Sequence, residues 1–390
     1  MEIYLDNAST TPVDPRVLEA MLPYFTEEYG NAESLHTKGQ NARVAVDNAR
    51  ETIAKILNCS SDEIIFTSGG TESNNLAIFG AARANSKKGK HLIVSSVEHS
   101  SVRAPFKKLE EEGYEVTWLK VDKEGFINQT EVATNIRPET IFVSVMYANN
   151  EIGTIEPIAK IGKICRAKGV IFHTDACQAA DSYDLDVEKL QVDMMTINAS
   201  KVYGPKGAGV LYVKRGIKIE PLILGSTHEN GLRAGTHNVP GIVGLGKAVE
   251  LAIIGQAEKN TRLVNLRNKL IKGVLEKMPG SQLNGPNPFD PKYANTACPR
   301  LPNNTNFTFK GIEGQDLLLQ LDNLGIYIGT GAACTVRTSK PSNVLHAIGL
   351  SSELIQSSVR MTLSKNTSET EIDHVLEILP GLIKKMRKRG

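Results

Sequence analysis

Short apolar runs rich in β-branched residues alternate with amphipathic stretches between Glu63 and Val213. The spacing of apolar positions predicts helices over Ser100–Glu112 and Ile158–Lys168, among others. It predicts strands over Glu63–Thr67, His91–Val97, Glu115–Val121, Ile141–Tyr147, Val170–Thr174, Asp193–Asn198 and Gly209–Val213. Because strands separated by helices need crossover connections, this order predicts a mostly parallel sheet covered on both faces. Ligands bind such sheets at the carboxyl ends of the strands.

The pattern changes in the last third of the chain. One long amphipathic helix is predicted from Val239 to about Met278, and a smaller α+β region follows it. That region is expected to end in a helix over Ser368–Arg389. The chain therefore divides into two regions of different secondary-structure order.

The N-terminal residues are assigned to the second region. Asp14 followed by Pro15 is typical of a helix N-terminus, and the residues before this point are expected to pack beside the C-terminal region. We therefore predict a large domain over residues 15–255 and a small domain formed by residues 1–14 and 256–390.

Composition narrows the class of protein. The chain has 45 Lys and Arg against 43 Asp and Glu, so it lacks the basic excess typical of nucleic-acid or anionic-membrane binders. Its 41% hydrophobic residues are ordinary for a globular protein. The acidic start Met1–Asp6 does not resemble a secretory signal, and nowhere do about 18 apolar residues follow one another. We expect a cytoplasmic protein with neither a membrane nor a nucleic acid as partner.

The cysteines do not suggest a disulfide framework or a metal site. There are five, Cys59, Cys165, Cys177, Cys298 and Cys334, and their odd number and wide spacing argue against disulfide bonds. No pair has Cys-X-X-Cys spacing, so no metal is expected. Cys59, Cys165 and Cys177 are expected to be buried and inert.

Cys334 has different neighbours. Small residues precede it, and a polar, basic segment with Arg337 and Lys340 follows it. This composition predicts a mobile loop in which the two cations favour a thiolate, although a buried, inert cysteine is the alternative. Arg360, in the strand-like run Ser357–Leu363, is a candidate for bidentate binding of a substrate carboxylate; an ordinary ion pair is its alternative.

Lys201 and Asp175 are candidates for cofactor chemistry. Lys201 leaves a buried strand into a turn rich in Gly and Pro, where an amine with a lowered pKa can form a Schiff base. Asp175 follows Val170–Thr174 at the same edge of the predicted sheet. A lysine that holds an aldehyde and a carboxylate that keeps a pyridine nitrogen protonated are what a pyridoxal phosphate enzyme needs. A surface lysine and a helix N-cap are the alternatives.

Other polar residues follow neighbouring strands at this edge. The turn Ser68–Asn75 opens a helix, so Gly70 and Thr71 are suited to binding a phosphate, although no Gly-Lys-Ser/Thr of a nucleotide P-loop follows. His99 is placed to stack on a cofactor ring and move protons, or is a structural histidine. Gln178 is placed to donate to a phenolic oxygen, or simply begins a helix.

These residues lie in motifs that resemble those of cysteine desulfurases of the NifS/IscS type, over nearly the whole chain. The matching segments are Leu5–Thr11, Gly30–His36, Thr67–Asn75, Glu98–His99, Asn149–Gly153, His173–Gln178, Lys201–Gly207, Gly231–Thr236 and Gly331–Cys334. The resemblance implies an α/β protein with the fold of type I pyridoxal phosphate-dependent transferases, which is aspartate aminotransferase-like. It also implies a large domain with a mostly parallel central sheet, a smaller α+β domain, a homodimer, and pyridoxal 5'-phosphate as cofactor.

The resemblance assigns roles by position. It makes Lys201 the Schiff-base lysine, Asp175 the partner of the pyridinium nitrogen, Gln178 the partner of the phenolate and His99 the residue that stacks on the ring. The implied phosphate ligands are Gly70, Thr71 and Ser200, together with Thr236 of the partner subunit. The implied ligands of the substrate carboxylate are Asn150 and Arg360, and the implied nucleophile is Cys334. One departure stands out, because the family's Ser-X-His-Lys is Asn198-Ala199-Ser200-Lys201 here. Ser200 can still donate a hydrogen bond, but weaker cofactor binding is expected.

The implied reaction converts L-cysteine to L-alanine and leaves the sulfur on Cys334 as a persulfide. An acceptor protein, such as an iron–sulfur scaffold or a tRNA-thiolation protein, would then take the sulfur. A selenocysteine lyase or another pyridoxal phosphate enzyme of this fold is the alternative. A non-enzymatic sulfur-transfer scaffold descended from the family is a further one, but it is expected to have lost Lys201 or Asp175, and both are present.

Overall fold

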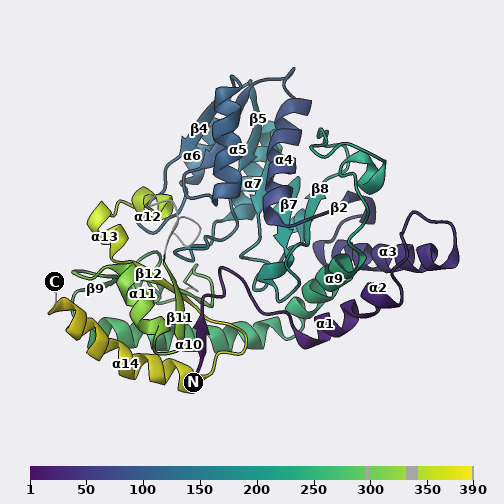
Figure 1. Ribbon diagram of the computed structural model, residues 1–390. Helices are drawn as coiled ribbons and strands as arrows, with labels where there is room; N and C mark the ends of the chain where they lie inside the picture. Colours follow the sequence, from purple (N-terminus) through teal and green to yellow (C-terminus); the bar gives the residue numbers. More distant parts are fainter. Residues whose placement is uncertain (296–297, 331–340, 389–390) are drawn as a thin grey trace.

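The computed structural model of the chain describes residues 1–295, 298–330 and 341–388, and its strands form two sheets (Figure 1). The larger sheet has seven strands in the order β2-β8-β7-β6-β5-β3-β4. Their bounds are β2 (Ile64–Thr67), β3 (His91–Ser95), β4 (Glu115–Leu119), β5 (Thr140–Ser144), β6 (Ile171–Asp175), β7 (Met194–Asn198) and β8 (Gly209–Val213). All seven predicted strands are present, with ends that differ from the prediction by at most three residues.

The sheet is mostly parallel, as predicted. Only β8 runs antiparallel, to both β2 and β7. Helices surround this sheet: α3 (Thr37–Leu57), α4 (Gly70–Ala84), α5 (Ser100–Glu111), α6 (Gln129–Asn135), α7 (Ile158–Lys168), α8 (Val187–Leu190) and α9 (Val239–Ile253). The two predicted helices, α5 and α7, match the structure to within one residue.

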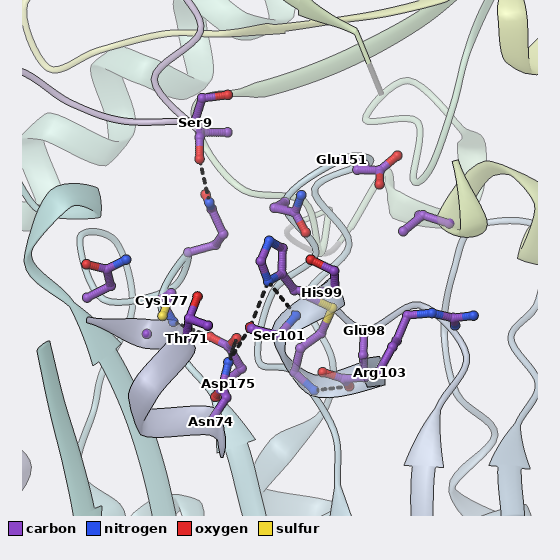
Figure 2. Close-up of a pocket in the computed structure, with 18 of the residues that line it drawn as sticks. Ser9, Thr71, Asn74, Glu98, His99, Ser101, Arg103, Glu151, Asp175 and Cys177 are labelled. Carbon is purple, nitrogen blue, oxygen red and sulfur yellow. Dashed lines mark hydrogen bonds between the residues drawn. The ribbon is translucent and has the colours of Figure 1, made fainter. Parts of the chain in front are cut away.

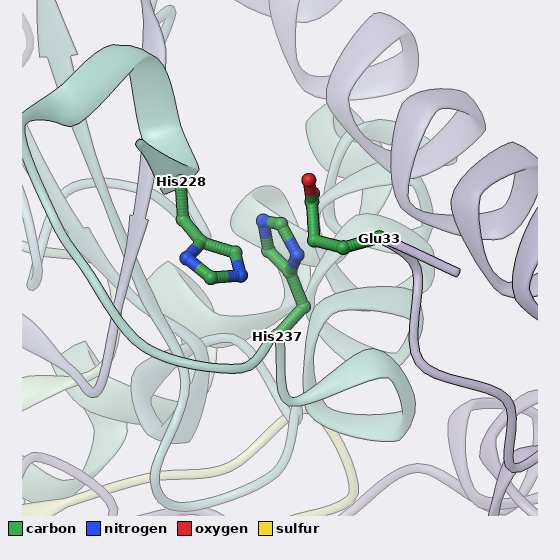
Figure 3. A group of neighbouring side chains, drawn as sticks. All are labelled: Glu33, His228 and His237. Atoms are coloured by element: carbon green, nitrogen blue, oxygen red, sulfur yellow. The ribbon is translucent and has the colours of Figure 1, made fainter. Parts of the chain in front are cut away.

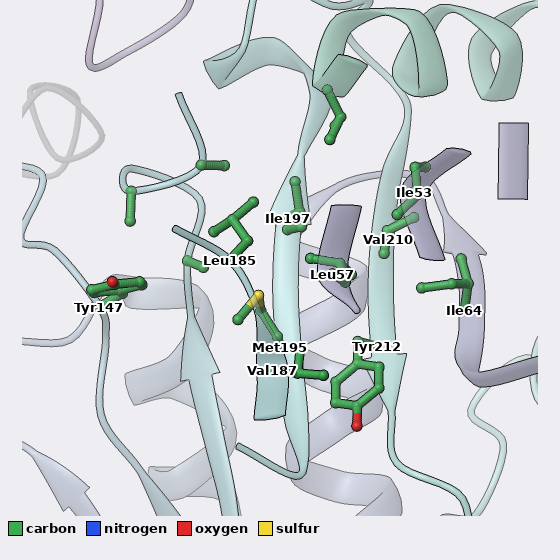
Figure 4. Packing of buried hydrophobic residues seen from close by; sticks show 14 of the residues in the cluster. Ile53, Leu57, Ile64, Tyr147, Leu185, Val187, Met195, Ile197, Val210 and Tyr212 are labelled. Atoms are coloured by element: carbon green, nitrogen blue, oxygen red, sulfur yellow. The ribbon is translucent and has the colours of Figure 1, made fainter. Parts of the chain in front are cut away.

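Alternate residues of the central strands pack on opposite faces of the sheet. Ile64 belongs to a cluster with Ile53 of α3 and Leu245 of α9, whereas Ile65 belongs to a cluster with Phe106 of α5. Figure 4 shows the first of these clusters, with α3 residues against β2, β7 and β8. Successive side chains of a strand point to opposite faces, so burial of both explains why these strands are apolar throughout.

The predicted single helix from Val239 to Met278 is wrong. The structure has two helices, α9 and α10 (Gln256–Lys277), whose axes differ by 74°. The break falls at Ile254 and Gly255, where the glycine has φ +63°. A glycine in this left-handed conformation ends a helix at little cost. The buried apolar positions of α10 begin at Leu263. Among the described helices, none is by itself long and apolar enough to cross a membrane, and only the bent pair α9 and α10 meets the length and composition together.

The smaller sheet joins the first strand of the chain to strands from its last third. Its strands are β1 (Ile3–Leu5), β11 (Ile326–Thr330), β12 (Ser358–Thr362), β10 (Asn304–Phe309) and β9 (Ser281–Leu283), in that spatial order. β1 pairs in parallel with β11, which confirms that the first residues pack beside the C-terminal region (Figure 1). The sheet shares one hydrophobic cluster with α10, α11 (Gly314–Asp322) and α14 (Glu369–Arg387). The exact division into domains stays a prediction.

The remaining helices are short. They are α1 (Pro15–Met21), α2 (Pro23–Thr26), α12 (Asn343–Ala347) and α13 (Ser352–Gln356). The Asp14 side chain accepts from the Arg16 backbone N–H, which confirms the predicted cap of α1. Ser368 caps α14 in the same way, one residue before that helix begins.

Candidate active site

A cavity of about 360 Å³ lies at the carboxyl ends of the large sheet's strands (Figure 2). Nine of the residues singled out in the sequence line it: Gly70, Thr71, His99, Asn150, Asp175, Gln178, Ser200, Lys201 and Arg360. They come from the ends of β2, β3, β5, β6 and β7 or the segments that follow them, and from β12 of the small sheet. The cavity therefore lies where the geometry of a parallel sheet predicts a ligand site.

Lys201 is held by the N-terminal segment of the chain. It lies in a short 3-10 turn, Ala199–Lys201, directly after β7. Its Nζ donates to the backbone oxygen of Ala8 at 2.8 Å and also to that of Ser9. Gln178 Nε2 donates to the same Ala8 oxygen at 2.9 Å. The loop between β1 and α1 thus orients the amine, a function that the sequence analysis did not assign to it.

Asp175 is buried at the end of β6, with its orientation fixed on both sides. Its Oδ2 accepts from Asn74 Nδ2 at 2.8 Å, and its Oδ1 accepts from the backbone N–H of Cys177 at 3.0 Å. Two N–H donors stabilise a carboxylate without neutralising it, because neither carries a positive charge. The carboxylate remains available to pair with a protonated ring nitrogen.

The turn after β2 lets the N-terminus of α4 face the cavity. Gly69 has φ +147°, which only glycine adopts without strain, and a Cβ on Gly70 would lie 2.9 Å from Cys177 Sγ. The first turn of α4 presents backbone N–H groups and the positive end of the helix dipole, a favourable environment for a phosphate. Thr71 lies in that turn and lines the cavity.

The two residues that depart from the family pattern contact each other. Asn198 Oδ1 accepts from the backbone N–H and from the hydroxyl of Ser200, both at 3.3 Å. These long hydrogen bonds cap the turn that carries Lys201. Ser200 lines the same cavity as Gly70 and Thr71, and the long hydrogen bond of its hydroxyl to Asn198 would cost little to exchange for a phosphate oxygen.

His99 is oriented by residues that the sequence analysis missed. Its Nδ1 accepts from the Ser101 backbone N–H at 3.2 Å and lies 2.8 Å from Ser101 Oγ. That hydroxyl accepts from Asn74 Nδ2 at 2.9 Å, so its own proton points to Nδ1. Asn74 thereby links His99 and Asp175 through one amide group (Figure 2). Burial lowers the pKa of His99, which favours a neutral ring with its proton on Nε2.

Arg360 forms an ion pair and also lines the cavity, so its role as a carboxylate ligand stays a prediction. Its guanidinium donates to Asp6 Oδ1 at 2.8 Å and to Ser9 Oγ at 2.7 Å, so the ion pair is present. It also donates to the backbone oxygen of Asn150 at 3.0 Å and lines the cavity. Its buried Nε has no partner within the described part of the chain. Asn150 contributes its carbonyl to this arrangement, a contact that the sequence does not reveal.

Two carboxyl groups, that of the buried Glu98 and that of the half-buried Glu151, also line the cavity without having been predicted. Burial raises the pKa of Glu98 to about 8 and that of Glu151 to about 7. Glu98 accepts from Ser95 Oγ at 2.7 Å, and Glu151 accepts from Ser342 Oγ. Both residues lie in the motifs quoted above, but the sequence of a motif does not show whether its carboxyl group will be buried.

Two predicted site residues are not part of the described cavity. Thr236 is exposed in the loop before α9, and Cys334 lies outside the described residues. Pro341 and Ser342, which follow the 331–340 segment, line the cavity. On its other side, a Cβ at Gly329 would lie 3.1 Å from the Arg360 guanidinium. The described residues on both sides of this segment therefore lie at the site.

The four described cysteines are free thiols. Cys165 is buried as expected, but Cys59 and Cys177 are partly exposed, because each lies in a loop rather than inside an element. Burial raises the pKa of Cys59 and of Cys165 to about 12, and that of Cys177 well above its ordinary value. None of these three thiols is suited to act as a thiolate.

Known proteins match this chain over nearly its full length, both in sequence and in structure. The aminotransferase class-V family profile matches residues 3–375. A cysteine desulfurase IscS of Clostridium botulinum is 48% identical over 387 residues, which cover 99% of this chain and 96% of that protein. A solved NifS-like protein has a TM-score of 0.90 and 35% identity, and covers 99% of this chain and 100% of its own. A structure described as SspA in complex with cysteine has a TM-score of 0.79 and 34% identity, and covers 94% and 100%.

Proposed function

The chain belongs to the class-V aminotransferase family and is a cysteine desulfurase, and from this premise we propose that Lys201, Asp175 and Cys334 carry its reaction. Membership implies pyridoxal phosphate as cofactor and L-cysteine as substrate. The observation that carries the proposal is that Lys201 and Asp175 line one cavity together with the N-terminus of α4.

The donors around the cavity fit the cofactor. Asp175 offers a fixed carboxylate for the ring nitrogen, and the start of α4 with Thr71 and Ser200 offers donors for the phosphate. His99 and Gln178 line the same cavity, and we propose that His99 stacks on the ring and that Gln178 donates to its phenolic oxygen. When bound, pyridoxal phosphate withdraws electrons from the α-carbon of the substrate.

The protein's own residues then carry out binding, proton transfer and sulfur transfer. Arg360 binds the substrate carboxylate, and the Lys201 amine removes the α-proton. The Cys334 thiolate attacks the substrate sulfur, so that an S–S bond forms while the C–S bond breaks. The electron pair of the C–S bond stays with the substrate carbon. The substrate then takes up protons and is released as L-alanine. The sulfur remains on the protein as a persulfide.

The test of this proposal is a visible absorbance spectrum of the purified protein before and after L-cysteine is added, with alanine measured in parallel. We expect cofactor absorption that changes on adding L-cysteine, together with formation of alanine. A protein that binds no pyridoxal phosphate when it is supplied would exclude the proposed site. Cofactor absorption that L-cysteine leaves unchanged would exclude the proposed roles in substrate binding.

Asp175→Asn should retain bound cofactor but lose turnover by at least about 100-fold, the scale typical of groups that control a proton at the reacting centre. An amide cannot stabilise the protonated ring, and it cannot accept from both Asn74 and the Cys177 N–H with the same geometry. Cofactor content and alanine formation are measured on the same sample. A variant with unchanged kcat would show that this carboxylate does not act on the ring.

We further propose a homodimer in which Thr236 reaches the partner's cofactor. Large apolar side chains are exposed along α1 to α3 and the adjoining loops: Leu18, Leu22, Phe25, Tyr29, Leu35 and Val44. These segments lie along one side of the molecule (Figure 1). A patch of this kind is typical of a surface that another chain covers. Sedimentation that finds a fully active monomer would contradict a shared site.

The sulfur acceptor and the location are also proposals. A persulfide on a cysteine next to the cavity would be passed to a second protein, and an iron–sulfur scaffold or a tRNA-thiolation protein is the kind of acceptor we propose. The free state of the four described cysteines fits a reducing compartment, so we propose that the protein is cytoplasmic.

A further inference from the structure

Two segments far apart in the sequence bring three potential metal ligands together. Glu33 lies in the loop before α3, whereas His228 and His237 lie on either side of the turn that precedes α9 (Figure 3). One ring nitrogen of each histidine and one carboxylate oxygen of Glu33 lie within 4.8 Å of one another. The described lining of the active-site cavity includes none of the three.

The imidazole of His237 is buried, and only one of its two ring nitrogens has a hydrogen-bond partner within the described residues. Its side chain is 6% exposed, and its Nε2 lies 2.8 Å from Glu229 Oε1. Glu229 also accepts two hydrogen bonds from Arg50, at 2.6 and 2.9 Å, so it is held as a carboxylate and takes the proton of Nε2. Nδ1 of His237 then keeps its lone pair, and it has no hydrogen-bond partner within the described residues.

A metal-binding histidine typically donates the N–H of one ring nitrogen to a carboxylate, which orients the ring so that the lone pair of the other nitrogen faces the metal. An unpaired buried nitrogen is otherwise costly, because it has lost its hydration without gaining a partner. A bound cation would remove this cost. The buried Nδ1 is therefore an observation that points to a ligand, independent of the clustering of the three side chains.

The other two candidate ligands, His228 and Glu33, each have one polar atom in a hydrogen bond and a second one that can bind a metal. His228 Nδ1 lies 2.5 Å from Ser226 Oγ, which leaves its Nε2. The two imidazole rings meet edge to face, with their centroids 5.1 Å apart. Glu33 Oε1 accepts from Arg43 at 3.2 Å, which leaves its second oxygen. Each of the three side chains can thus offer one atom to a shared cation.

We propose that Glu33, His228 and His237 bind a divalent transition-metal ion, for which Zn²⁺ is the best match. Two imidazole nitrogens and one carboxylate oxygen are typical zinc ligands, whereas Mg²⁺ and Ca²⁺ prefer oxygen alone. Tetrahedral zinc requires ligand atoms roughly 3.4 Å apart, so the cluster must close by about an ångström on binding. Glu33 is exposed and His228 partly exposed, so rotation of their side chains can supply this movement.

The ion would tie the loop before α3 to the segment from Ser226 to His237. It would stabilise the folded chain by an amount that grows with the logarithm of its concentration above Kd, because the unfolded chain does not bring these residues together. The cysteine spacing predicts no metal, and it could not have revealed this site, since Glu33 is remote in sequence from both histidines. The site does not depend on the proposed roles of Lys201, Asp175 and Cys334.

The test uses the full-length protein with its cofactor, stripped of metal and titrated with Zn²⁺ against a chromophoric chelator. We expect one tight site per chain and a rise in Tm on adding Zn²⁺. Glu33→Gln and His228→Gln should each weaken binding more than about tenfold, since even loss of an outer-shell partner costs that much. The matched control is His374→Gln on α14, whose ring lies 4.0 Å from Glu377 and outside the cluster, and it should bind Zn²⁺ like the parent.

Co²⁺ distinguishes the proposed ligands from thiols. At this site it should give visible bands of nitrogen and oxygen ligation without the intense charge-transfer band of a thiolate. Equal zinc affinity in the parent and His228→Gln would overturn the proposal, as would a thiolate band that His228→Gln leaves unchanged. A parent protein that competes for Zn²⁺ no better than the double variant Glu33→Gln/His228→Gln would overturn it too.

Discussion

Lys201→Ala is expected to abolish desulfurase activity, with a loss on the order of 10⁴-fold or more, because the role proposed for this one side chain is both to attach the cofactor and to move the α-proton. Lys201 leaves β7 directly into the cavity, and the backbone oxygens of Ala8 and Ser9 orient its amine. No other lysine lines the described cavity. The variant should also lose the visible absorption that the cofactor acquires on attachment to a lysine.

Borohydride reduction of the parent protein followed by peptide mapping locates the attached lysine directly. The label should fall on the peptide that contains Lys201. Lys206→Ala is the matched control, because Lys206 lies in the same Gly- and Pro-rich turn but is exposed. It should keep both the absorption and the activity. A label on Lys206 would show that the site is assigned wrongly.

The sequence predicts the large sheet well because its strands are buried on both faces. Such strands are continuous apolar runs, and the polar residues that end them, such as Asp175 and His99, mark the carboxyl edge. The long helix after Val239 could not be predicted correctly in the same way. Both halves of this stretch are amphipathic helices, and only the backbone at Ile254 and Gly255 shows that the first one ends there.

The contacts that orient the site were beyond sequence reasoning. Asn74 lies in a quoted motif, but its amide reaches Asp175 and Ser101 only because β6, α4 and α5 meet at one edge. Ser9 reaches Lys201 and Arg360 from the opposite end of the chain. Such pairings depend on the register between strands that are remote in sequence. Residue type predicts which groups carry chemistry, whereas tertiary packing decides which groups hold them in place.

Cys334→Ser separates sulfur transfer from the other reactions that this fold supports. The variant should bind cofactor, and its spectrum should change on adding L-cysteine, because Lys201, Asp175 and Arg360 are unaltered. It should release neither alanine nor sulfide, a loss on the order of 10⁴-fold, since a serine hydroxyl has far too high a pKa to accept sulfur as a thiolate does. A stopped reaction with an intact spectral change would place Cys334 after substrate binding.

The persulfide itself can be located in the parent protein. Brief exposure to L-cysteine, alkylation and mass spectrometry should show one added sulfur on the Cys334 peptide. Cys177→Ser is the matched control, because Cys177 also lines the cavity, but burial raises the pKa of its thiol well above the ordinary value. This control should keep its activity and still accumulate the persulfide on Cys334. Sulfur found on Cys177 in the parent, with Cys334→Ser still active, would move the nucleophile to the loop after β6 and would end the role proposed for Cys334.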